Sequence, residues 1–211
     1  MNAIGIFGGT FDPVHFGHLR AAVEAREKLA VADFRLLPAG RPPHRDAPGA
    51  SPEQRLQMLR QAIAGCPDLQ VDDREVRRSG YSYMADTLAE IRAEAGDVPL
   101  LLLIGQDAAN ALDTWHQWRR LFELAHLVVM RRPDAHFRCV GELRTEIERR
   151  RVHAPAGLHE RPAGQVLSLE ITQLDISSTD IRARLASDRS PRFLLPDQVL
   201  DYIRSQGLYS Q

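Results

Sequence analysis

Cysteine and lysine are the scarcest chemistry-bearing residues of this chain of 211 residues. The two cysteines, Cys66 and Cys139, are too few for a disulfide framework or a cysteine-based zinc site. Such usage is typical of a reducing cytosol, so we expect a cytoplasmic protein. No run of 18 apolar residues occurs, and the first residues form an apolar pattern without a basic segment. We therefore expect neither a membrane span nor a signal peptide.

The chain also lacks an excess of positive or negative charge. The formal net charge is -1 and the isoelectric point is near 6.7, which argues against a general polyanion-binding surface and against nucleic acid as a partner. Lys28 is the only lysine among 27 basic residues. Hydrophobic residues make up 44% of the chain and charged residues 26%, the balance of a soluble globular protein. At this length we expect a single domain spanning residues 1–211.

Apolar runs and amphipathic stretches alternate along most of the chain. The runs typical of buried strands lie at residues 4–7, 34–37, 69–71, 100–104, 127–130 and 166–169. The stretches typical of helices lie at residues 16–29, 52–64, 82–94, 142–150, 179–185 and 196–206. This alternation predicts an α/β fold with a doubly wound parallel sheet, whose ligands bind where strands lead into helices.

Local signals mark where several of these elements begin. Ser51, Pro52 and Gln54 form a helix-start signature, with a serine cap, a first-turn proline and a glutamine three residues after the cap. We expect Ser178 to cap the helix at 179–185. Residues 131–163, rich in arginine, proline and histidine, are predicted to be a surface insertion or a mobile segment.

A glycine-rich turn, Gly8-Gly9-Thr10, follows the first predicted strand. Neither GxGxxG nor GxxxxGK[ST] occurs in the chain, which argues against dinucleotide-dependent hydride transfer and P-loop hydrolysis. Glycines still permit a ligand to approach the backbone closely. The residues alone leave two interpretations open, a phosphate-binding loop and an ordinary strand-exit turn.

Two histidines, His15 and His18, stand three residues apart at the start of the next helix, so both rings can face one side. A catalytic zinc site needs three protein ligands, and HExxH and CxxC are both absent. A helix start instead offers free N–H groups suited to anions, and two imidazoles would add donors. Phosphate binding is therefore the stronger interpretation, and we expect no dedicated metal site.

Two motifs about 160 residues apart carry a family resemblance. The segment Gly8-Gly9-Thr10-Phe11-Asp12-Pro13-Val14-His15-Phe16-Gly17-His18 resembles the signature of the HxGH nucleotidylyltransferase superfamily, which is related to class I tRNA synthetases. The segment Ile176-Ser177-Ser178-Thr179-Asp180-Ile181-Arg182 resembles the ISSTxIR motif that replaces KMSKS of the synthetases. The resemblance implies a Rossmann-like nucleotidylyltransferase fold with a small C-terminal helical portion at about residues 177–211.

Three further segments resemble bacterial nicotinate-nucleotide adenylyltransferases, and the likeness covers nearly the whole chain. They are Pro42-Pro43-His44-Arg45, Ser82-Tyr83-Met84-Ala85-Asp86-Thr87-Leu88, and Ile104-Gly105-Gln106-Asp107 followed by Thr114-Trp115. One departure is Ala39-Gly40, where an asparagine is common in relatives. If that asparagine holds the substrate, the contact is absent or replaced in this chain.

The resemblance implies transfer of AMP from ATP to nicotinate mononucleotide, giving deamido-NAD and pyrophosphate in NAD biosynthesis. It implies that His15, His18 and Arg182 are catalytic through the phosphates. The implied ATP-binding residues are Gly8, Gly9, Thr10, Gly105, Asp107, Ser178 and Thr179. The implied substrate-binding residues are His44, Arg45, Tyr83, Thr87 and Trp115, with the indole stacked on the pyridine ring. Mg²⁺ would be held mainly by ATP phosphates and water.

Two other functions compete with this one. Another enzyme of the superfamily, such as a pantetheine-phosphate adenylyltransferase, would share both motifs, but the Ser82–Leu88 segment and the Thr114-Trp115 pair argue against it. A nucleotide-binding regulator that has lost catalysis is disfavoured by the intact histidines and Arg182. The sequence leaves the oligomeric state open.

Overall fold

The described residues fold around a seven-stranded sheet. The computed structural model describes residues 3–42, 48–131, 138–172 and 174–210. The strand order is β3-β2-β1-β4-β5-β7-β6, and every pair of neighbours is parallel. The strands are β1 (Ile4–Gly9), β2 (Asp33–Pro38), β3 (Gln70–Val71), β4 (Leu100–Gly105), β5 (His126–Arg131), β6 (Arg151–Val152) and β7 (Val166–Glu170). The predicted doubly wound parallel sheet is confirmed.

The order of the strands reverses between β1 and β4. From β1 the chain builds outward through β2 to β3, and it then returns to place β4 on the other side of β1. Ile6 of β1 lies in register with Arg35 of β2 and Leu102 of β4. Ligands of open α/β sheets bind at the carboxyl ends of strands where such a reversal occurs. The ends of β1 and β4, at Gly9 and Gly105, are therefore where a site is expected.

Both faces of the sheet are buried, because helices cover each of them. In β4, Leu101 and Leu103 point into one apolar cluster, whereas Leu100 and Leu102 point into the other. Helix α1 (Phe16–Leu29) buries its alanines in the first cluster, and helix α4 (Met84–Ala95) buries Leu88 in the second. Strands buried on both faces are continuously apolar, which explains why β4 is the clearest run in the sequence.

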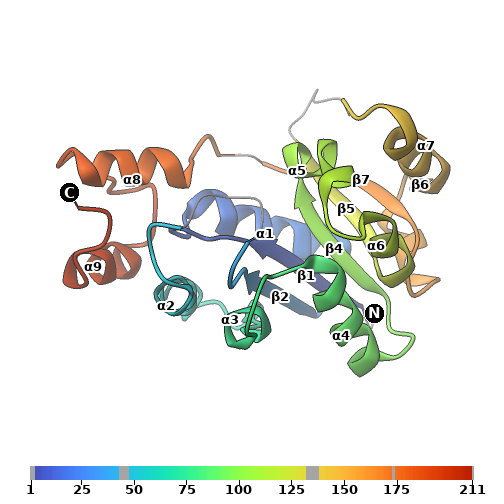
Figure 1. Cartoon of the computed structure of the whole chain (residues 1–211), viewed down its shortest axis with the longest axis horizontal. Helices are drawn as coiled ribbons and strands as arrows, with labels where there is room; N and C mark the ends of the chain where they lie inside the picture. The colour runs from blue at the N-terminus through green and yellow to red at the C-terminus, as the bar shows by residue number, and fades with distance from the viewer. Residues whose placement is uncertain (1–2, 43–47, 132–137, 173, 211) are drawn as a thin grey trace.

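Helices connect the strands along the chain, as Figure 1 shows. They are α1 (Phe16–Leu29), α2 (Pro52–Ala62), α3 (Arg74–Arg77), α4 (Met84–Ala95), α5 (Gln106–Asn110), α6 (Trp118–Leu124), α7 (Gly141–Arg150), α8 (Ser178–Ala186) and α9 (Asp197–Ser205), with short 3₁₀ turns η1 (Leu112–Thr114) and η2 (Pro155–His159). Within the described ranges, no helix combines the length and apolar character that crossing a bilayer requires.

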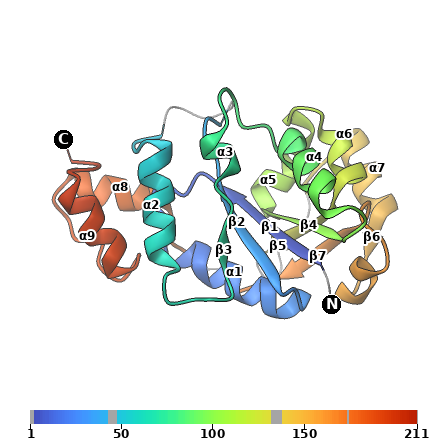
Figure 2. The ribbon, with the colours of Figure 1, turned by 90° about the horizontal axis from the view of Figure 1, so that it is seen from below.

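The last two helices extend the molecule beyond the β2 side of the sheet. Figures 1 and 2 both place α8 and α9 at one end, with α2 beside them. Helix α9 packs on α2, and α2 packs on β2. The buried residues Val199, Leu200 and Ile203 of α9 belong to the same apolar cluster as the alanines of α1. The C-terminal segment is thus attached to the sheet through α2.

Helix α2 begins as its sequence predicts. The Ser51 side chain accepts a hydrogen bond from the Gln54 backbone N–H at 3.2 Å, and the Gln54 side chain accepts one from the Ser51 N–H at 2.8 Å. This reciprocal pair is a capping box. The capping box fixes the first turn of α2, the helix that carries Arg55.

Two expectations about chain organisation are wrong. The cap of α8 is Ser177, whose hydroxyl accepts from the Asp180 N–H at 3.1 Å, whereas Ser178 is the first helical residue and bonds to another segment. The described part of residues 131–163 is also not an appendage. Helix α7 buries Leu143 and Ile147 in the core, and β6 pairs with β7 at the edge of the sheet.

Candidate active site

A cavity of about 1020 Å³ opens at the carboxyl ends of β1 and β4. Its volume lies at the upper end of the range for small-molecule sites. The turn after β1, the start of α1, the exit of β2, the segment leading into α4 and the segment after β4 form its walls. Leu174 and Ile176, just before α8, also line it. The cavity therefore lies where the strand order places a ligand.

Nine of the residues singled out from the sequence line this cavity. They are Gly8, Gly9, Thr10, His15, His18, Tyr83, Gly105, Asp107 and Trp115. Ser178, Thr179 and Arg182 are not among the lining residues, but Ser178 and Arg182 bond to the turn that leads into α1, and Thr179 bonds to Arg182. His44 and Arg45 lie outside the described residues.

The two histidine rings are stacked, with centroids 3.8 Å apart and planes 25° apart. Phe11 packs its ring edge-on to His18 at 5.0 Å. Burial lowers the pKa of His15 from 6.5 to about 4, so its ring is neutral near pH 7. Its Nδ1 is buried and has no hydrogen-bond partner among the described residues. An unpaired buried nitrogen costs free energy, which a ligand that hydrogen-bonds it would recover.

Gly17 permits this arrangement. A Cβ atom at residue 17 would lie 2.9 Å from Nδ1 of His15 and 3.5 Å from the backbone oxygen of Ile176. The first of these distances is shorter than Cβ contacts in proteins, so any side chain at residue 17 would displace the His15 ring. The glycine between the histidines therefore lets the His15 ring lie across the helix start and lets the segment before α8 approach it.

The second motif is bound directly to the first. Ser178 donates a hydrogen bond from its hydroxyl to the Pro13 carbonyl at 3.0 Å. The Arg182 guanidinium donates to the Asp12 carbonyl at 2.6 Å and to the Thr179 hydroxyl at 3.4 Å. Residues about 160 positions apart in the sequence thus form one polar cluster beside the histidines. Their side chains do not line the cavity wall in this conformation.

Asp12 is a residue that the sequence analysis missed. Its buried carboxylate accepts hydrogen bonds from the backbone N–H groups of Gly49 and Ala50 at 2.9 and 3.2 Å, and from the Tyr209 hydroxyl at 2.7 Å. It also lies 3.6 Å from the Arg182 guanidinium. Burial and the bond to Asp12 raise the pKa of Tyr209. The signal for Asp12 was its place inside the first motif; nothing local marks Tyr209.

Thr87 is not at the cavity, contrary to the sequence-based expectation. Helix α4 begins at Met84, so Thr87 lies one turn inside it and faces α3. Its hydroxyl donates to the Glu75 carboxylate at 2.7 Å and accepts from the Arg78 guanidinium at 2.8 Å. Its side chain is fully buried. The residues at the start of α4 that do line the cavity are Tyr83 and Met84.

Three aromatic residues, Tyr83, Trp115 and His116, form an aromatic wall of the cavity. The rings of Tyr83 and His116 lie 4.4 Å apart with 38° between their planes, and Trp115 lies beside them. His116 did not stand out in the sequence analysis, although it directly follows Trp115. Flat rings of this kind suit stacking on an aromatic ligand.

The described residues of the site offer hydrogen-bond donors and acceptors rather than a metal-binding group. Among the described residues, no three His, Cys, Asp or Glu side chains form a group that could hold a metal ion. The polar residues that line the cavity include His15, His18, Glu75, Ser82 and Asp107. Such a site is suited to binding and orienting two reactants that carry their own charges.

Comparisons with known proteins find relatives of this chain at both high and low sequence identity. The profile of the family described as cytidylyltransferase-like matches residues 6–184. A protein of Methylococcus capsulatus named "Probable nicotinate-nucleotide adenylyltransferase" is 51% identical over 209 residues, covering 99% of this chain and 100% of that one. One of the same name from Marinobacter nauticus is 51% identical over 205 residues, covering 97% of this chain and 95% of its own.

Solved structures show the same fold at much lower identity. A nicotinic acid mononucleotide adenylyltransferase of Plasmodium falciparum complexed with NaAD superposes with a TM-score of 0.76 at 16% identity, covering 99% of this chain and 98% of that chain. The same protein complexed with APC superposes with a TM-score of 0.73 at 15% identity, with the same coverage. Identities this low establish the fold alone.

Proposed function

We infer that this chain, which belongs to the cytidylyltransferase-like family, is an enzyme that transfers the adenylyl group of ATP to nicotinate mononucleotide. The products are deamido-NAD, a precursor of NAD, and pyrophosphate. Relatives with this activity in their names are about half identical over nearly the full length of the chain. The observation that carries the proposal is the direct contact of the two motifs, Ser178 with Pro13 and Arg182 with Asp12, beside one cavity.

The reaction needs positioning more than chemical groups. A phosphate oxygen of the mononucleotide attacks the α-phosphorus of ATP, a new P–O bond forms, and the bond to the pyrophosphate oxygen breaks in line with it. The attacking oxygen is already an anion, so no protein nucleophile is required. The protein contributes by aligning two anions and by stabilising charge that builds on the leaving pyrophosphate.

We propose that His15 and His18 donate hydrogen bonds to the ATP phosphates, with His18 the more critical of the two. Because His15 is neutral, it would act as a dipolar donor rather than as a cation. The backbone of Gly8, Gly9 and Thr10 would allow the nucleotide to approach β1 closely.

We propose that Ser178, Thr179 and Arg182 bind the β- and γ-phosphates from the start of α8. Arg182 is about one-third exposed, and its five N–H donors exceed the two bonds made to Asp12 and Thr179. Because the cluster already touches Asp12 and Pro13, a small movement would bring it to a triphosphate held by the histidines. We propose on this ground that residues 1–211 act as one catalytic unit.

The remaining contacts divide between the two nucleotides. We propose that Gly105 and Asp107 bind adenosine, with the Asp107 carboxylate on the ribose hydroxyls. Tyr83 and Trp115 would bind the pyridine ring, since both lie on the aromatic wall. Thr87 supports the start of α4 from inside rather than touching the substrate. His44 and Arg45 stay proposed contacts for the substrate phosphate.

Members of this enzyme class generally use a divalent metal, and we propose Mg²⁺ for this chain. The described residues fit an ion that enters with the nucleotide, because they provide no three-ligand group of their own. Phosphate oxygens and water are the ligands that Mg²⁺ prefers in such sites, and the ion would neutralise triphosphate charge. We also propose a cytosolic location, which fits the free thiols of Cys66 and Cys139.

A coupled assay of pyrophosphate release tests the proposal. With ATP present, we expect turnover with nicotinate mononucleotide, less with its amide, and none with phosphopantetheine. His18→Ala should lower kcat/KM by about 100-fold or more, the magnitude typical of losing one transition-state donor. His153→Ala, which changes an exposed ring, serves as the matched control. Activity with phosphopantetheine alone would assign the chain to a different transferase, and ATP binding without any turnover would indicate a regulator.

A further inference from the structure

Arg55 of α2 is a fully buried cation bound to backbone carbonyls. Its Nη1 donates to the carbonyls of Thr10 and Ala39 at 2.7 and 2.6 Å. Its Nη2 donates to the Gly40 carbonyl at 2.8 Å, and its Nε to the Ala50 carbonyl at 3.3 Å. A buried charge is costly unless it is well hydrogen-bonded. Here the bonds join three segments: the exit of β1, the exit of β2, and the start of α2.

Ser82 binds the exit of β2 from the opposite side. Its hydroxyl accepts hydrogen bonds from the N–H groups of Gly40 and Arg41 at 3.0 and 3.1 Å. The C=O and N–H of a trans peptide group point in opposite directions. The peptide groups 39–40 and 40–41 are therefore held twice, by Arg55 through their carbonyls and by Ser82 through their N–H groups.

The lone pairs of the Ser82 hydroxyl are both in use. A hydroxyl offers one proton and two lone pairs. The two N–H groups occupy the lone pairs, so the hydroxyl cannot accept a further hydrogen bond from a substrate. Although Ser82 lines the cavity, its role as an acceptor is to hold the turn.

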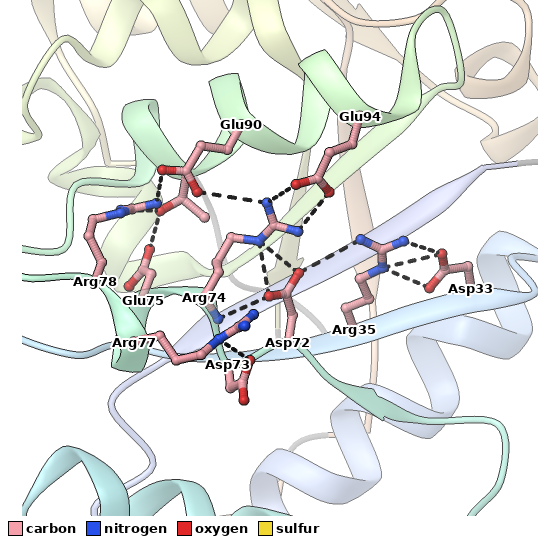
Figure 3. A network of polar contacts seen from close by, with 11 residues as sticks. Asp33, Arg35, Asp72, Asp73, Arg74, Glu75, Arg77, Arg78, Glu90 and Glu94 are labelled. Atoms are coloured by element: carbon pink, nitrogen blue, oxygen red, sulfur yellow. Dashed lines mark hydrogen bonds and ion pairs between the residues drawn. The ribbon is translucent and has the colours of Figure 1, made fainter.

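Helix α3 closes the third side of this turn. A Cβ atom at Gly40 would lie 2.2 Å from the backbone oxygen of Glu75, so no side chain fits at residue 40. Figure 3 shows that α3 is itself fixed, because Arg74 binds Asp72 and Glu94 at the same time. Ala39-Gly40 is also the place where the sequence lacks the asparagine that is common in similar proteins. The Glu75 backbone oxygen leaves no space for an asparagine side chain at residue 40.

The turn held in this way forms one wall of the cavity. Ala39 and Pro42 line it beside Ser82, Tyr83 and Glu75. This wall adjoins the aromatic residues assigned above to the pyridine ring, and it lies on the other side of β1 from Gly105 and Asp107. A shift of the turn would change the space next to the acceptor more than the space next to adenosine.

We propose that Ser82 and Arg55 are positioning residues that set the acceptor side of the cavity by holding peptide groups 39–40 and 40–41 between them. The proposal rests on the proposed function for the identity of the acceptor, nicotinate mononucleotide. Without the Ser82 acceptor, two N–H groups lose their partner, and the turn must move to recover hydrogen bonds. The consequence is weaker binding of the acceptor with little change in the chemical step.

Steady-state kinetics of the full chain test this, with each substrate varied at saturating concentration of the other. We expect Ser82→Ala to raise KM for nicotinate mononucleotide by about 10-fold, the fold-change that corresponds to losing one buried hydrogen-bond acceptor. KM for ATP and kcat should each change by less than about 2-fold. Ser82→Thr, which keeps the hydroxyl, should restore KM to within about 3-fold of wild type. Ser205→Ala, a distant serine on α9, is the matched control.

Arg55→Lys gives a second, independent measurement. One ammonium group cannot reach carbonyls in three segments at once, so the same rise in KM for the mononucleotide is expected, together with a lower melting temperature. If Arg55→Lys does not fold, the kinetics of Ser82→Ala and Ser82→Thr decide alone. Unchanged KM for the mononucleotide in Ser82→Ala, or equal rises for both substrates, would overturn the proposal. Absence of turnover in the wild type would instead refute the proposed function.

Discussion

Buried neutral His15 should make the stability of this protein depend on pH in a defined way. In the unfolded chain, a histidine has a pKa of 6.5, whereas burial lowers the pKa of His15 in the folded protein to about 4. Between these values the unfolded state binds a proton that the folded state does not. Stability is therefore fully present above pH 6.5 and is lost as the pH falls from 6.5 towards 4.

The loss of unfolding free energy depends on how far the pH falls below 6.5. Each pH unit below 6.5 removes about 1.4 kcal/mol, so lowering the pH from 7.5 to 5.0 should remove about 2 kcal/mol through His15. His15 is 5% exposed, so solvent screening reduces this figure little. Against a total stability of about 5–15 kcal/mol, such a change is easily measured.

The contribution of His15 to the free energy of unfolding can be isolated by urea denaturation of the wild type and of His15→Gln at both pH values. The variant cannot titrate at residue 15, so the stability difference between the two proteins should shift by about 2 kcal/mol between pH 7.5 and 5.0 in favour of the variant at the lower pH. His153→Gln, with an exposed ring, provides the baseline for replacing a histidine. Parallel pH profiles for wild type and His15→Gln would refute the conclusion that the folded protein keeps this ring neutral.

Three substitutions test other parts of the structure by urea or thermal denaturation. Ser51→Ala removes half of the capping box of α2 and should cost about 1 kcal/mol of unfolding free energy; an unchanged denaturation midpoint would contradict the observed cap. Tyr209→Phe removes the hydroxyl bonded to Asp12 and should cost about 1–2 kcal/mol, whereas Tyr81→Phe, at an exposed tyrosine, should cost nothing measurable. Gly40→Ala should lower the free energy of unfolding by about 1–3 kcal/mol, because the added Cβ atom meets the Glu75 backbone oxygen of α3. Gly65→Ala is the control, because a Cβ atom there meets nothing within 4 Å. Equal effects of the two substitutions would refute the contact between Gly40 and α3.

Much of the fold could be predicted from local patterns. The strands at the centre of the sheet are continuous apolar runs, and β4 was predicted at 100–104 against Leu100–Gly105 in the structure. Helix α1 was predicted with its observed bounds, and the cap of α2 was predicted from three residues. These signals are reliable because hydrophobic periodicity and capping depend on residues that are neighbours in the chain.

Predictions that depend on side-chain direction were less secure. Thr87 lies on α4 as expected, but one turn too far along the helix to reach the cavity, so it bonds to α3 instead. Ser177 caps α8 while the adjacent Ser178 reaches Pro13, and two neighbouring serines cannot be told apart by type. In both cases the residue at which the helix begins decided the outcome, and the residue types alone do not mark it.

The sequence by itself determined the parallel sheet, the order of its helices and the two motifs of the adenylyltransferase family. It also placed His15 and His18 where β1 leads into α1. Only the tertiary structure decided what holds the site together: Arg55 on four carbonyls, Ser82 on two N–H groups, and Asp12 between Tyr209 and Arg182. These contacts join segments that are distant in the chain, and their partners are largely backbone atoms, which every residue carries. A hydrogen bond to a backbone atom has no residue type to mark it, so it becomes visible only when the chain has folded.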